Sequence, residues 1–220
     1  MGIATTLALV WLNRKFLLKD GFPGNALGLS LHQSPWFLAG GLIAIIYVGL
    51  IAGALWLLTP FHWVPGTITG GNVAWRFAEY FGSNFTEELM FRGYLLLILR
   101  RSLASGRAIL IVSLLFGLFH LPGLSGIVAL NMICTTALFS CILCLVFIKT
   151  RSLWTAVGMH VVGNTLLHRV LGMSGEESVF RMTFVKRPPT RYDAGLIAYV
   201  VVSLVTIIVL IRTAGDSRRT

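Results

Sequence analysis

Apolar segments close to the length of a membrane span follow one another along almost the whole chain. A helix crosses the hydrocarbon core of a bilayer with about 20 mostly apolar residues. Lipid offers no partners to backbone polar groups, so such segments are expected to be helical. The chain is 56% hydrophobic and only 12% charged, whereas a soluble domain is about 25% charged. We therefore predict an all-α, polytopic membrane helix bundle.

These segments predict about seven spans, within a range of six to eight. Their predicted bounds are 2–18, 35–59, 84–100, 107–121, 126–148, 152–171 and 193–212. The third and fourth segments are short or polar, so the other helices should shield them from lipid. The longest polar stretch, 172–191, is predicted as a loop, and residues 1–220 as a single integral membrane domain. In the second segment, Gly49 and Gly53 form a GxxxG pattern that permits close helix approach.

The net charge of +10 indicates contact with lipid rather than with nucleic acid. In a membrane protein, basic residues flank the spans and set their orientation. They also attract anionic lipid headgroups. Most of the 18 Lys and Arg residues lie on the same side as the segment between the first two predicted helices. This bias predicts an N-terminus outside the cytoplasm and a C-terminus inside it.

Two adjacent glutamates stand out in the third predicted helix. Glu87 and Glu88 open this helix, whereas the other acidic residues lie in loops or at helix ends. An ionisable side chain at mid-depth costs about 2.5–3.5 kcal/mol, so it indicates a functional site. Glu88 and Arg92 have the i, i+4 spacing of an ion pair. Glu87 lacks such a local partner, which suits a general base. A packing network of both glutamates with Arg92 is the alternative.

Other polar residues lie in two further predicted helices. His120 ends the fourth segment, one turn after Phe116, whose ring is placed to wall a pocket. His160 and Asn164 share one face of the sixth segment, and His168 extends that stripe by a turn. Taken alone, His120 reads as a helix cap and the His160–Asn164 pair as structural hydrogen bonding. Their functional interpretation depends on the glutamates.

Glu87 completes a chemical inventory for hydrolysis. A carboxylate and a histidine activate water, and His or Asn side chains donate to an oxyanion. One Glu with two His is also a zinc ligand set, here Glu87, His120 and His160. Buried Glu, Arg and His line ion paths too, which leaves a small transporter as one alternative. A non-catalytic membrane scaffold or binding protein is the other.

Three motifs in this order resemble the CPBP family of intramembrane proteases. The family includes type II CAAX prenyl endopeptidases and bacteriocin-processing proteins. Its pattern of EExxxR, FxxxH and HxxxN is matched by Glu87–Arg92, Phe116–His120 and His160–Asn164. The motifs occupy separate predicted helices, in a core of about 84–171.

The resemblance implies an endopeptidase that hydrolyses a peptide bond of a membrane-associated protein, including lipidated or membrane-anchored substrates. By resemblance, Glu87 and His120 activate water, and His160 and Asn164 stabilise the oxyanion. The supporting residues are Glu88, Arg92 and Phe116. Because the family is often described as metalloproteases, one divalent metal such as zinc on Glu87, His120 and His160 is the competing scheme. The expected location is a bacterial or archaeal cell membrane.

Overall fold

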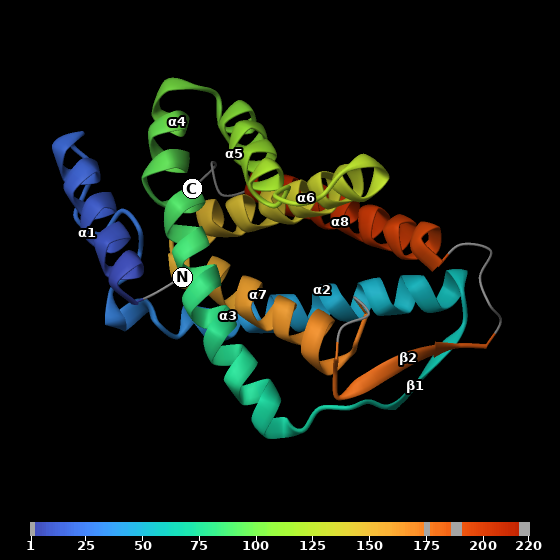
Figure 1. Ribbon diagram of the computed structural model, residues 1–220. Helices are drawn as coiled ribbons and strands as arrows, with labels where there is room; N and C mark the ends of the chain where they lie inside the picture. Colours follow the sequence, from blue (N-terminus) through green and yellow to red (C-terminus); the bar gives the residue numbers. More distant parts are fainter. Residues whose placement is uncertain (1–2, 174–176, 186–190, 216–220) are drawn as a thin grey trace.

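The protein is mostly helical in a computed structural model that describes residues 3–173, 177–185 and 191–215 (Figure 1). The α-helices are α1 (Ile3–Lys19), α2 (Trp36–Leu58), α3 (Gly70–Met90), α4 (Leu96–Ser102), α5 (Ser105–Phe119), α6 (Gly126–Thr150), α7 (Leu153–Asn164) and α8 (Arg191–Gly215). A 3₁₀ turn, η1 (Leu31–Gln33), precedes α2, and two π-helical segments, η2 (Phe91–Leu95) and η3 (Thr165–Val170), follow α3 and α7. The predicted all-α class is confirmed.

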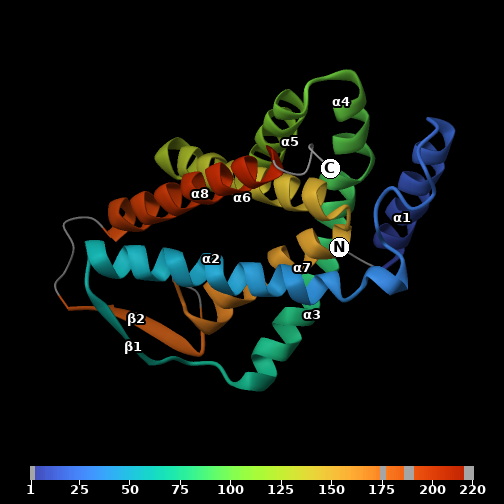
Figure 2. The same cartoon turned by 180° about the vertical axis from the view of Figure 1, so that it is seen from behind.

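The helices pack as a membrane bundle around α2, α6 and α7. In this bundle α2 lies along α7, α6 contacts α5 and α8, and α3 contacts α1 and α7 (Figures 1 and 2). Within the described chain, three helical segments are long and apolar enough to cross a membrane: Leu31–Leu58, Gly126–Thr150 and Ala194–Thr213. The total of seven spans stays a prediction.

Glycines set the close approach of α2 and α7. A Cβ on Gly40 would overlap the carbonyl oxygen of Thr155, and one on Gly158 would overlap that of Phe37. Among the residues that the structure describes, none lies within 4 Å of a Cβ built on Gly49 or Gly53. The close approach permitted at that GxxxG pattern is therefore absent there, because the crossing point lies nearer the start of α2.

The third helix begins well before its predicted start at residue 84. It starts at Gly70, and Glu87 and Glu88 lie in its last turns instead of opening it. Aromatic residues hold the earlier part in the bundle: the rings of Phe77 and Phe81 lie 6.4 and 5.9 Å from that of Phe37. The interspersed polar residues interrupt the apolar run, so the length criterion missed these turns.

A backbone break separates α3 from α4. Gly93 has φ −71° and ψ −126°, which is not helical. Asn13 of α1, only 5% exposed, accepts a hydrogen bond from the Tyr94 N–H at 2.5 Å and donates to the Leu9 carbonyl at 2.8 Å. A Cβ on Gly93 would overlap Asn13 Oδ1. The absence of a Cβ on Gly93 thus leaves room for the Asn13 amide, which accepts a hydrogen bond from the backbone at the helix break.

A small antiparallel sheet was not predicted. Strand β1 (Phe61–Pro65) pairs with β2 (Phe180–Phe184), with Phe61 opposite Phe184 and Pro65 opposite Phe180. Phe61 and Met182 pack with Leu55 and Ala198 in a satellite core. The stretch 172–191 is therefore not simply a loop, although residues 174–176 and 186–190 of it lie outside the described chain. Two short strands this far apart in sequence leave no periodic signal.

Candidate active site

Glu87, His120 and His160 come together from three helices. Glu87 lies in the last turn of α3, His120 follows the end of α5, and His160 lies in α7. Glu87 Oε2 is 3.9 Å from His120 Nε2 and 4.0 Å from His160 Nε2. This oxygen is buried and has no hydrogen-bond partner among the described residues. The two imidazoles thus converge on one unpaired carboxylate oxygen.

The other nitrogen of each imidazole is held by an acceptor. His120 Nδ1 lies 2.8 Å from the Phe116 carbonyl oxygen, which can only accept, so Nδ1 donates. His160 Nδ1 lies 2.8 Å from Glu88 Oε1. Both Nε2 atoms are therefore turned toward Glu87. Gaps of 3.9 and 4.0 Å are too long for direct hydrogen bonds but suit a bridging water.

Glu88 and Arg92 form a fully buried ion pair. Arg92 Nη1 lies 3.2 Å from Glu88 Oε1, and both side chains are 0% exposed. Arg92 Nη2 also donates to the Ser140 hydroxyl at 2.7 Å and to its carbonyl oxygen at 3.2 Å. The pairing expected from the i, i+4 spacing is present. Glu88 additionally binds His160, a contact that the spacing did not reveal.

Aromatic rings enclose these polar groups. Phe116, 1% exposed, lies 4.5 Å from the Arg92 guanidinium carbon and 4.5 Å from the His120 ring. The His160 ring lies 5.9 Å from Phe116 and 5.4 Å from Phe139 of α6. Phe116 thus walls the site on the side predicted for it, and its π face meets the buried cation.

Asn164 lies one turn beyond His160, and its Nδ2 is 3.5 Å from Oδ1 of Asn84. Beyond Asn164 the helix becomes π-helical, and His168 there approaches Tyr80, with ring centroids 6.3 Å apart. Asn84, 2% exposed, was missed. The signal that could have indicated Asn84 is its i−4 spacing to Glu88, within the predicted helix 84–100.

Ser140 and Asn13 were also missed. A single serine in the apolar segment around Ser140 carries no distinctive signal. The role of Asn13 depends on the backbone break after α3. The residues that neighbour Asn13 in the sequence give no sign of that break.

The residues predicted as zinc ligands do not have the spacing of such a site. Two ligands of a tetrahedral zinc ion lie about 3.3 Å apart when each bond is about 2.0 Å. The two distances from Glu87 Oε2, to His120 and to His160, are 3.9 and 4.0 Å. Over the part of the chain that the structure describes, no group of three or more His, Cys, Asp or Glu side chains has metal-binding geometry. Metal dependence stays a hypothesis for experiment.

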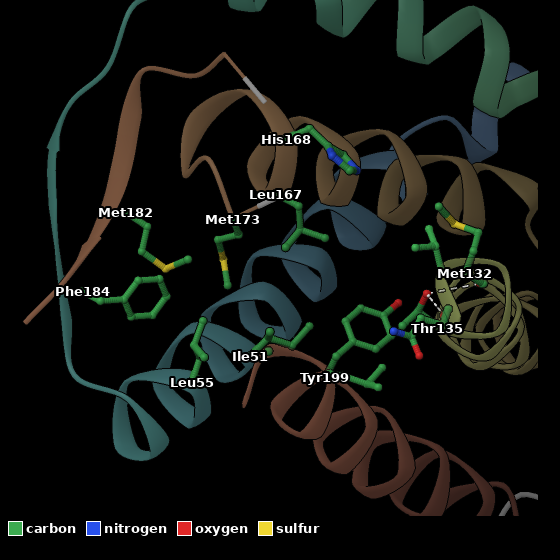
Figure 3. Close-up of a pocket in the computed structure, with 14 residues that line it drawn as sticks. Ile51, Leu55, Met132, Thr135, Leu167, His168, Met173, Met182, Phe184 and Tyr199 are labelled. Atoms are coloured by element: carbon green, nitrogen blue, oxygen red, sulfur yellow. Dashed lines mark hydrogen bonds between the residues drawn. The ribbon is translucent and has the colours of Figure 1, made fainter. Parts of the chain in front are cut away.

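A cavity of about 620 Å³ opens between α2, α6, η3, α8 and β2 (Figure 3). Its lining is mostly apolar and includes Met132, Met173 and Met182. Flexible thioethers adapt to apolar ligands of varied shape. Tyr199 in the wall lies 6.1 Å from Tyr47, which stacks at 6.0 Å on Phe139 of the site. A series of ring contacts therefore links the cavity lining to Phe139, whose ring lies 5.4 Å from that of His160.

The fold and the site define an integral membrane protein with a partly buried carboxylate–imidazole centre. Residues 69–166 match the family model Rce1-like, described as type II CAAX prenyl endopeptidase Rce1-like. The match bears out the resemblance seen in the three motifs, and it supports a CAAX-type intramembrane protease in general. The matched segment contains all the motif residues from Glu87 to Asn164. None of the curated proteins matches the chain.

Proposed function

We propose that this protein is an intramembrane endopeptidase in which Glu87 and His120 activate a water molecule. The observation that carries the proposal is the convergence of His120 Nε2 and His160 Nε2 on Glu87 Oε2, at 3.9 and 4.0 Å. An unpaired carboxylate oxygen and an unprotonated imidazole nitrogen beside it can each accept a hydrogen bond from a bridging water. The site therefore has the groups that a general base needs.

In the proposed reaction, the water oxygen attacks the carbonyl carbon of a peptide bond while Glu87 takes a proton. The carbonyl oxygen becomes an oxyanion. Asn164 donates to it, and so does His160 when its Nε2 carries a proton. The peptide C–N bond then breaks, and the proton held by Glu87 passes to the leaving nitrogen. Glu88 and Arg92 hold His160 in place and make no contact with the substrate.

The substrate proposed is a peptide segment of a membrane-associated protein, lipidated or membrane-anchored. The mostly apolar cavity of about 620 Å³ beside the site supports an apolar group on the substrate. The location proposed is a bacterial or archaeal cell membrane. Metal-assisted hydrolysis is the competing scheme, and a non-catalytic scaffold or a transporter of the same fold is the competing function.

The test is cleavage by the purified protein in lipid nanodiscs. The substrates are a prenylated CAAX peptide, a bacteriocin leader peptide and a membrane-anchored peptide. Glu87→Gln keeps the shape of the side chain but not its basicity, so cleavage should be nearly abolished with an unchanged melting temperature. Glu79→Gln, an exposed substitution on the same helix, is the matched control and should cleave like wild type.

Full cleavage by Glu87→Gln would remove Glu87 from the mechanism. If wild type cleaves none of the substrates, the result favours the scaffold or transporter function instead. The same assay is repeated after exhaustive chelation, with metal content measured by elemental analysis. Undiminished cleavage by metal-free protein excludes the zinc scheme, whereas loss that added zinc restores establishes it.

A further inference from the structure

The seam between α3 and the α7–η3 segment carries a polar pair at successive helical turns. The pairs are Glu88 with His160 at 2.8 Å, Asn84 with Asn164 at 3.5 Å, and Tyr80 with His168, whose rings are 6.3 Å apart. From one pair to the next, the residue number falls along α3 and rises along the α7–η3 segment, so the two helices run antiparallel. The asparagine pair therefore lies about one turn, or 5.4 Å, from the pair that holds the glutamate.

Asn84 is the unusual member of this seam. Its Oδ1 accepts from Asn164 Nδ2 at 3.5 Å and from the Ser83 hydroxyl at 3.4 Å. Its Nδ2 is buried and has no hydrogen-bond partner within the described residues. The residue as a whole is 2% exposed. An unpaired buried donor destabilises a fold, so an apolar side chain would serve packing better here.

We propose that Asn84 is a further functional residue of the hydrolytic site. Its Oδ1 positions the amide of Asn164, and its Nδ2 donates a second hydrogen bond to the carbonyl oxygen of the scissile peptide as that oxygen becomes negative. The inference rests on the proposed peptidase function. It explains why the donor has no protein partner: the partner is the substrate.

The position of Asn84 on α3 agrees with this role. Asn84 is i−3 to Glu87 and i−4 to Glu88, so it lies on the helix face that carries both carboxylates. Asn164 has the same relation to His160 on α7. The amides thus form one layer and the carboxylate–imidazole groups the next. A peptide carbonyl between the layers would have its carbon toward the water at Glu87 and its oxygen toward the amides.

The test compares Asn84→Leu and Asn84→Asp with wild type in the cleavage assay. Leucine has a similar volume and neither donates nor accepts, and aspartate keeps the acceptor but lacks the donor. Loss of one oxyanion donor lowers kcat by about 10²- to 10³-fold, so both variants should lose kcat on that scale with KM within about twofold. Asn72→Leu, at the exposed start of the same helix, is the control and should keep wild-type kcat.

Thermal unfolding separates this role from a structural one. Asn84→Leu removes an unpaired buried donor, so its melting temperature should equal or exceed that of wild type. A structural asparagine would instead lose melting temperature and kcat together. A double-mutant cycle with Asn164→Leu adds a second readout: the double variant should lose little more kcat than either single variant, because the two amides act on one oxygen.

The results distinguish this inference from the proposed function. If Glu87→Gln cleaves like wild type, or wild type does not cleave, the peptidase mechanism fails and the role of Asn84 fails with it. If Glu87→Gln is inactive while Asn84→Leu keeps wild-type kcat, only the inference on Asn84 is wrong. Loss of kcat in Asn84→Leu together with a lower melting temperature also overturns it.

Discussion

Glu88→Gln tests whether the buried ion pair holds the site together. Glutamine keeps the size of the side chain and removes its charge. Arg92 is 0% exposed and would keep the Ser140 contacts and the face of Phe116, but no anion. His160 would lose the carboxylate that binds its Nδ1 at 2.8 Å. The substitution should therefore reduce both stability and cleavage.

The magnitude follows from the burial of the pair. Removing one partner of a buried ion pair costs about 3–5 kcal/mol, because the other charge is left uncompensated. For a chain of this length, each kcal/mol lowers the melting temperature by about 2–4 °C. Glu88→Gln should therefore melt roughly 6–20 °C below wild type.

The assay is thermal unfolding in nanodiscs, followed by tryptophan fluorescence. The double variant Glu88→Gln/Arg92→Met removes both charges and should recover most of the lost stability. The matched control is the exposed Arg76–Glu79 pair on the same helix, with atoms 2.7 Å apart and side chains 47% and 44% exposed. The hydrogen bond from Arg76 lowers the pKa of Glu79, but solvent screens this pair, so Glu79→Gln should not change the melting temperature measurably.

Two outcomes would refute this reasoning. Glu88→Gln could melt with wild type, which would mean that the Arg92 charge is compensated elsewhere. Alternatively, Arg92→Met could lower the stability of Glu88→Gln further, which would mean that the guanidinium stabilises the fold independently of the glutamate.

Backbone contacts give the remaining predictions. Gly158→Ala should destabilise the protein strongly, because the new methyl group meets the carbonyl oxygen of Phe37. Gly53→Ala, whose methyl group would have no described neighbour within 4 Å, should be neutral or slightly stabilising in the same unfolding assay. Gly93→Ala should lower both melting temperature and kcat, because its methyl group displaces the Asn13 amide from the break after α3. A wild-type melting temperature for Gly158→Ala or Gly93→Ala contradicts these contacts.

Much of the bundle was predictable because the length and composition of apolar segments indicate which helices contact lipid. The order of the helices and the ends near Pro60 and Pro122 followed from that pattern. The early turns of α3 did not, because they are amphipathic and packed by aromatic contacts rather than immersed in lipid. The two strands paired across more than half of the chain, and only tertiary contact brings them together.

In the site, helical spacing predicted local partners and was silent on distant ones. Four residues along a helix place Glu88 beside Arg92, and this pair is present. Glu87 faces histidines of other helices. This position was predicted from the absence of a local partner and from the resemblance to the CPBP family. Asn84 escaped notice because its contact is with Asn164 of another helix, which spacing along a single helix does not reveal.

The adjacency of Glu87 and Glu88 has a physical reason in this geometry. Successive residues of a helix point about 100° apart, so one carboxylate meets Arg92 while the other enters the site. His160 joins them: its Nδ1 binds Glu88 at 2.8 Å, and its Nε2 lies 4.0 Å from Glu87. Glu88 neutralises a buried cation and orients the imidazole through Oε1, while Oε2 of each glutamate is buried without a hydrogen-bond partner among the described residues. Glu87 Oε2 differs in its surroundings: the Nε2 atoms of His120 and His160 lie 3.9 and 4.0 Å away, so a water that bridges these atoms can give its proton to Glu87.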